Sequence, residues 1–147
     1  MNGRRVFLGL IGATAGTLAL PACGSPAGSP TEASGPLSGG NISALPVGTL
    51  SVIDGQPVVI ARDAMGVYAM STICTHARCD MRDSGSISNG GLECSCHGSS
   101  FDANGVPFAG PARSVLPHWK VTIAADGSIT VLAGTAVDPS VRVSAAG

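Results

Sequence analysis

The chain has 147 residues, of which 44% are apolar, and a nearly balanced formal charge of −1 with a single lysine, Lys120. This length favours one folded domain, and the lack of a basic cluster beyond Arg4 and Arg5 argues against a nucleic-acid partner. Gly and Pro number 21 and 10, which favours short strands and turns over long helices.

Residues 1–22 have the features of an export signal and are not expected to belong to the fold. Arg4 and Arg5 precede a mostly apolar stretch, residues 6–20, and this arrangement resembles a twin-arginine signal. The stretch is shorter than the about 20 residues that a membrane-spanning helix needs. It ends in Leu-Pro-Ala-Cys, which resembles a lipoprotein cleavage box with Cys23 as the lipid-bearing residue. An ordinary signal or an uncleaved anchor is the alternative.

Residues 23–40 are rich in Gly, Ser and Pro and lack apolar periodicity, so they are predicted to form a flexible linker. The folded domain is expected at 41–143, with a short tail at 144–147. Together with the signal, this order predicts a domain exported across the bacterial cytoplasmic membrane. It would be tethered to the outer face of that membrane by lipid or by the N-terminal segment.

The elements expected in the folded part are β-strands. Alternating apolar residues on both sides of Asp54-Gly55 and of Asp126-Gly127 predict two hairpins, because Asp-Gly is a strong turn signal. The predicted strands are 49–53, 57–63, 66–71 and the two halves of 119–133. The fold class is therefore all-β, a small antiparallel sandwich or barrel.

Residues 72–114 are expected to be a loop-rich insertion, because Gly, Ser, Cys and Pro are frequent there and periodicity is weak. So long a stretch without structure is unusual in a compact domain unless something holds it together. The cysteines are the candidates. Nearby, Tyr68 and Trp119 are expected in the core, His118 is expected at the surface or partly buried, and Arg78 and Arg82 are expected to be solvated.

Two boxes in this insertion each combine two cysteines with one histidine: Cys74, His76 and Cys79 in the first, Cys94, Cys96 and His97 in the second. Two plain disulfides would suit an exported protein. A structural zinc site could use two Cys and two His, although the spacing differs from that of zinc fingers. An iron–sulfur cluster could hold one iron by two Cys and the other by two His.

Both boxes, CTHARC and CSCHGSSF, resemble those of Rieske [2Fe–2S] proteins, and GPAR at 110–113 resembles the proline-containing loop of that family. The resemblance implies a Rieske fold, in which a β-sheet base carries an inserted cluster-binding subdomain, and one [2Fe–2S] cluster. It also implies roles for individual residues. Cys74 and Cys94 would bind the buried iron, His76 and His97 the outer iron, Cys79 and Cys96 would form a disulfide, and Gly110, Pro111 and Ala112 would cover the cluster.

The extra cysteine pair, with Ser99 after the second box, is similar to the quinol-oxidising branch, the iron–sulfur subunits of cytochrome bc and bf complexes. That branch implies electrons and protons taken from quinol and electrons passed to a cytochrome c-type acceptor, beside a cytochrome b. The chain would then be a redox subunit and not an enzyme alone. A small subunit beside a molybdenum subunit, as in arsenite oxidase, and a free-standing lipid-anchored carrier are the alternatives.

Two positions are expected to tune the reduction potential. Ser99 matches a family serine whose hydroxyl donates to a bridging sulfide. Phe101 stands where the high-potential members carry a tyrosine that donates to a ligand sulfur, so the resemblance implies a lower potential for this chain.

Overall fold

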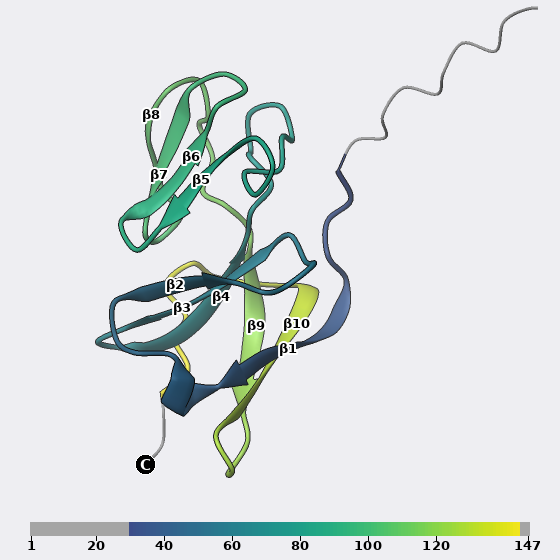
Figure 1. Ribbon diagram of the computed structural model, residues 1–147, viewed down its shortest axis with the longest axis vertical. Helices are drawn as coiled ribbons and strands as arrows, with labels where there is room; N and C mark the ends of the chain where they lie inside the picture. The colour runs from purple at the N-terminus through teal and green to yellow at the C-terminus, as the bar shows by residue number, and fades with distance from the viewer. Residues whose placement is uncertain (1–29, 145–147) are drawn as a thin grey trace, which may run out of the picture.

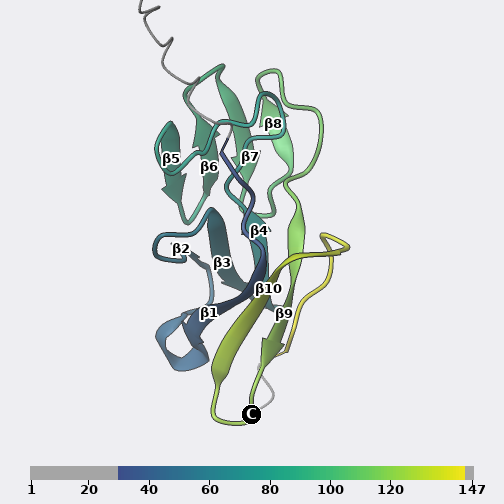
Figure 2. The same ribbon diagram turned by 90° about the vertical axis from the view of Figure 1, so that its right-hand side faces the viewer.

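The computed structural model describes residues 30–144, and the regular structure there is antiparallel β-sheet apart from one short 3-10 helix, η1 (Ile42–Ala44). The strands form two sheets, one of six strands and one of four, which confirms the all-β prediction. Figures 1 and 2 show the smaller sheet placed at one end of the larger one. Within the described range, no helix is long and apolar enough to cross a membrane.

The six-stranded sheet is the base of the molecule, with strand order β1-β10-β9-β4-β3-β2. Both predicted hairpins are present in it, since β2 pairs with β3 and β9 pairs with β10. The pairing of β4 with β9 joins the two hairpins. The strands are β1 (Gly35–Asn41), β2 (Thr49–Val52), β3 (Val58–Asp63), β4 (Gly66–Ser71), β9 (His118–Ile123) and β10 (Ser128–Val137).

The first strand lies in the range that the sequence assigns to the linker. β1 pairs with β10 from Gly35 onward, so the sheet begins before residue 41. One glycine of this segment, Gly39, has a packing role. A Cβ at Gly39 would lie 2.6 Å from Ile60 Cδ1 and 3.0 Å from Ile129 Cγ2, so the missing side chain allows the close approach of the strand to the core at this position. The composition of this segment indicated flexibility, but its backbone pairing makes it an edge strand.

The strands β3 and β4 are buried on both faces. One face packs in the core of the base and the other in a core shared with the insertion. Val58, Ile60 and Val67 point into the core of the base, whereas Val59 and Met70 point to a second core. Successive side chains of a strand point to opposite faces, so a strand between two cores is apolar at nearly every position. The continuous apolar run in β3 follows from that position.

The insertion between β4 and β9 contains a four-stranded sheet of order β5-β6-β7-β8. The sequence predicted a loop-rich insertion and no strands there, because strands of three or four residues are too short to show periodicity. The insertion also has apolar contacts of its own, with Leu92, Phe101 and Leu116 packing against the outer face of β3 and β4. Its strands are β5 (Gly85–Ser88), β6 (Gly91–Cys94), β7 (Ser99–Asp102) and β8 (Pro107–Ala109).

Tyr68 and Trp119 are buried as predicted, with 4% and 8% exposure. His118 is also buried, at 2% exposure, so the expectation of a surface or partly buried histidine is wrong. Its ring stacks on Tyr68 with 6.0 Å between centroids, and its Nδ1 lies 2.8 Å from the Leu116 carbonyl oxygen. Burial lowers the pKa of His118, since water no longer stabilises the charged ring.

Candidate metal centre

The two boxes lie on neighbouring loops at the ends of short paired segments. Ile73, which precedes the first box, forms an isolated bridge with Asp80, which follows it. The second box begins at Cys94, the last residue of β6, and ends where Ser99 starts β7. Each pairing closes its own loop, and the Cys79–Cys96 disulfide joins the two loops, so residues about twenty positions apart in the sequence meet at one site.

Cys74 and Cys94 are free thiols with 1% and 2% exposure. Burial raises the pKa of the Cys94 thiol, and the nearby side chain of Cys74, close enough to hydrogen-bond, raises it further. The raised pKa favours the neutral form of the Cys94 thiol when no metal is bound. A bound metal deprotonates coordinating thiols, because its own charge stabilises the thiolates. The pair therefore fits a buried metal position.

His76 and His97 are exposed, in contrast to the two thiols. Their rings meet edge to face with 4.7 Å between centroids, one ring from each loop. Histidine is the commonest metal ligand, and it can also carry a proton near neutral pH. The site thus has a buried thiol side and a solvent-facing imidazole side. That division fits a [2Fe–2S] centre in which two His replace two Cys on one iron.

A disulfide joins the two loops through the remaining cysteines, Cys79 and Cys96, with 6.7 Å between their Cα atoms. This is the pairing that the family resemblance implies. The sulfurs of Cys79, Cys94 and Cys96 all lie within 4.8 Å of one another, so the disulfide borders the free thiol of Cys94 directly.

A third loop, residues 110–113, closes over the second box. A Cβ at Gly110 would lie 2.2 Å from the Gly98 carbonyl oxygen, so only glycine allows this close approach. The Ala112 amide donates to Ser99 Oγ at 3.1 Å, and Thr75 Oγ1 donates to the Ser114 carbonyl at 2.7 Å. Because Ser99 accepts a bond from Ala112, its own hydroxyl proton is left to donate elsewhere. Phe101, with 1% exposure, lies in the same apolar core as Cys74 and Cys94.

Both arginines beside the first box form ion pairs. Arg82 is partly buried, contrary to the expectation that it is solvated, whereas Arg78 is exposed as expected. Arg82 bonds both carboxylate oxygens of Asp80, which is 7% exposed and also accepts from Thr72. Burial alone would raise the pKa of Asp80, but the bonds from Arg82 and Thr72 hold it below the usual value. Arg78 forms an ion pair with Glu32 at 3.6 Å. Short-range sequence patterns contained no signal for either pair.

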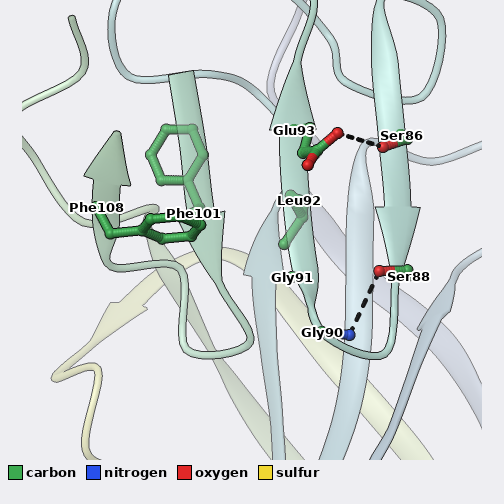
Figure 3. A pocket seen from close by; sticks show the side chains of 8 residues that line it. All are labelled: Ser86, Ser88, Gly90, Gly91, Leu92, Glu93, Phe101 and Phe108. Carbon is green, nitrogen blue, oxygen red and sulfur yellow. Dashed lines mark hydrogen bonds between the residues drawn. The ribbon is translucent and has the colours of Figure 1, made fainter. Parts of the chain in front are cut away.

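A hollow of about 410 Å³ lies elsewhere on the four-stranded sheet (Figure 3). Ser86 donates to Glu93 across its wall at 3.2 Å. None of the cysteines or histidines of the two boxes lines it, so this hollow is separate from the candidate centre. The lining residues are Ser86, Ser88, Gly90, Gly91, Leu92, Glu93, Phe101 and Phe108.

Comparisons with known proteins agree with this geometry. The model of the Rieske [2Fe–2S] domain matches residues 40–120. A cytochrome b6-f complex iron-sulfur subunit of Synechococcus sp. (strain CC9605) is 32% identical over 105 residues, covering 67% of this chain and 55% of that protein. The carotenoid phi-ring synthase of Chlorobaculum tepidum is 33% identical over 87 residues, covering 59% of this chain and 13% of that protein. The chain thus spans about half the length of the b6-f subunit and a small part of the synthase.

Two solved structures share the fold. A cyanobacterial plasma membrane Rieske protein from Synechocystis PCC 6803 has a TM-score of 0.50 and 24% identity, over 65% of this chain and 97% of that one. A chain from the oxygenase–ferredoxin complex of carbazole 1,9a-dioxygenase has the same TM-score and identity, over 70% of this chain and 96% of that one. At this identity the two structures support the architecture of base and insertion.

Proposed function

This chain belongs to the Rieske [2Fe–2S] domain family and is an electron-transfer protein with one such cluster, and on that premise we propose that it accepts electrons, together with protons, from a quinol. We propose Cys74 and Cys94 as the ligands of the buried iron and His76 and His97 as those of the outer iron. The observation that carries this proposal is the division of the site into a buried thiol pair and an exposed imidazole pair.

When bound, the cluster supplies a one-electron acceptor. The chain's own contribution is to place an imidazole at the surface, where a quinol hydroxyl can reach it. A solvent-facing nitrogen of His97 or of His76 would accept a hydrogen bond from that hydroxyl and then its proton, and the bound cluster would be the acceptor for one electron. A carrier without an exposed base could take the electron but would leave the proton to solvent.

The quinol-oxidising branch is favoured over ferredoxin-like carriers by the Cys79–Cys96 disulfide. In the oxygenase and ferredoxin members of the family, the two boxes lack this extra cysteine pair. The printed names of several similar proteins support the same choice, since they are cytochrome b6-f complex iron-sulfur subunits. A c-type cytochrome is the proposed acceptor.

A rapid-mixing experiment on the oxidised, cluster-loaded full-length protein tests this proposal. Reduced menaquinone or ubiquinone analogues should bleach the visible absorbance of the cluster, and a c-type cytochrome added next should restore it. Reduced methyl viologen, which donates an electron without a proton, is the matched control. Rapid reduction by viologen with none by either quinol would reject the quinol proposal and leave a Rieske carrier with another donor.

We also propose that the protein is exported and tethered through its N-terminal segment, as the export-like signal and the box at Cys23 suggest. These residues lie outside the described range. Mass spectrometry of protein extracted from membranes should find an N-terminal Cys23 that bears lipid. An intact Met1 would instead mean that the signal is kept as the anchor.

A further inference from the structure

The chain enters the fold beside the first box. Glu32 Oε1 lies 3.6 Å from Arg78 Nη2, and the same guanidinium nitrogen donates to the Pro30 carbonyl oxygen at 3.4 Å. Arg78 lies between His76 and Cys79, inside the loop that the proposed ligands occupy. Residues 30–32 are therefore in direct contact with the loop of the candidate centre.

A second contact leads from this segment to Cys74. Ser71 Oγ donates to Glu32 Oε2 at 2.7 Å and accepts from the Ile73 amide at 3.0 Å. Ser71 is fully buried, with 0% exposure, so Glu32 is the acceptor that this hydroxyl has in place of water. Ile73 directly precedes Cys74. Hydrogen bonds thus connect residue 32 with the residue before a proposed cluster ligand.

Arg78 has a left-handed backbone conformation, which is unusual for a residue other than glycine. Its φ is 62°, and among residues 30–144 it is the one residue other than glycine with a positive φ. This left-handed conformation closes the loop, with the Arg78 amide donating to the Cys74 carbonyl at 3.0 Å. Glycine would adopt it without strain, whereas arginine does so at a cost that the surrounding structure has to offset. The contacts with Glu32 and Pro30 are what the arginine side chain adds at this position.

We propose that Arg78, Glu32 and Ser71 form a clasp that docks residues 30–32 reversibly on the first box. Ala33 is buried in the core of the base and anchors the chain on the inner side of the clasp. The clasp is weak enough to open, because the side chains of Arg78 and Glu32 keep 53% and 28% exposure and exposed ion pairs contribute little. Opening it frees three residues, which lengthen the tether by about 10 Å at about 3.4 Å per residue.

The use of this clasp rests on the proposed function of a tethered carrier. A docked tether restricts the position of the cluster-binding end relative to its anchor, and a released tether allows a longer reach toward a second redox partner. The clasp itself requires neither a quinol nor a membrane. It can therefore be tested on the isolated cluster-loaded protein, and the result is independent of the quinol experiment.

The test is ¹⁵N relaxation of the cluster-loaded full-length protein, with the order parameters of residues 31 and 32 as the measurement. In the wild type these should be close to the about 0.85 of rigid backbone. Glu32→Gln and Arg78→Gly should each lower them below about 0.6. Salt at about 1 M, where the Debye length is about 3 Å, should lower them in the wild type as well. Glu93→Gln, which removes an exposed carboxylate bonded to Ser86, and Ala77→Gly, which loosens the same loop, should leave them unchanged.

Thermal unfolding of the same variants separates a clasp from a purely structural arginine. Arg78→Gly removes the left-handed strain, so its melting temperature should equal or exceed that of the wild type while residues 31 and 32 become mobile. A melting temperature below that of Ala77→Gly would overturn the proposal, because Arg78 would then be needed for the loop itself. Order parameters unchanged in Glu32→Gln, or already low in the wild type, would overturn it too.

Discussion

The base and the insertion are stabilised in different ways. The base is a sheet of six strands around an apolar core of its own, and Asp-Gly turns set its two hairpins. The insertion has strands of three or four residues, a core shared with β3 and β4, one disulfide and several side-chain bonds between loops. We therefore expect the base to tolerate changes at the site and the insertion to depend on its cross-links. This difference can be tested by damaging each region separately.

The largest effect is expected from the histidines. His76→Ala or His97→Ala should abolish the Rieske electron paramagnetic resonance signal of the dithionite-reduced protein, because one iron loses half its protein ligands. Far-ultraviolet circular dichroism should still show the base folded. A normal resonance spectrum from either variant would remove that histidine from the ligand set.

A core substitution in the base should lower the stability of the protein and leave the resonance signal unchanged. Ile129→Ala removes a side chain of 1% exposure from the core of the base. Large-to-small changes of this kind cost about 2–5 kcal/mol of unfolding free energy. Chemical denaturation should show this loss, while the resonance spectrum of the remaining folded protein stays as in the wild type. A shifted spectrum would mean that the two regions are less independent than their separate cores indicate.

Removal of the disulfide should affect the insertion alone. The double change Cys79→Ser with Cys96→Ser opens a cross-link over 17 positions of sequence, and for a loop of this size about 3 kcal/mol is expected from chain entropy. The cluster should still assemble but be lost sooner on dilution or mild heating, as followed by visible absorbance. Mapping of free thiols in the wild type should find neither Cys79 nor Cys96, and a free thiol at either would contradict the pairing.

A finer change within the insertion concerns the reduction potential. Phe101→Tyr should raise the midpoint, because a hydroxyl could then donate toward a ligand sulfur, and Ser99→Ala should lower it. One hydrogen bond to a charged acceptor contributes about 1.5–3 kcal/mol, which corresponds to about 60–130 mV for one electron at about 59 mV per tenfold change. Protein-film voltammetry of the three proteins measures this. An unchanged midpoint in Phe101→Tyr would reject the hydrogen-bond explanation.

The smallest effect is expected at the junction of the two regions, where His118 is buried beside Tyr68. Its folded-state pKa lies below the ordinary 6.5, with burial as the largest cause. The unfolded state therefore binds one more proton as the pH falls below about 6.5. Stability should fall in that window by no more than about 1.4 kcal/mol per pH unit, until the folded pKa is passed. Denaturation of the wild type and of His118→Asn across this range should show a shallower slope in the variant. Equal slopes would exclude His118 as the source.

The parts of the chain that the sequence predicted well are those with a local chemical signal. Asp54-Gly55 and Asp126-Gly127 require hairpin turns, and their flanking strands appear where the alternation places them. The two Cys/His boxes carry the family resemblance in residue type and spacing, and the structure brings them together at one site, while their role as cluster ligands stays a prediction. Tyr68 and Trp119 were predicted in the core because large rings on alternating strands are seldom exposed.

Tertiary structure decided the features that depend on residues far apart in the sequence. Gly39 belongs to a strand and not to a linker, because its missing side chain lets β1 lie against Ile60. His118 is buried beside the Tyr68 ring of a neighbouring strand, 50 positions away in the sequence, and the Glu32–Arg78 contact joins positions 46 apart. Turn chemistry and ligand spacing act between near neighbours and can be seen in a short stretch. Burial, and an ion pair such as Glu32–Arg78, depend on which distant segments meet, and that is set when the chain packs.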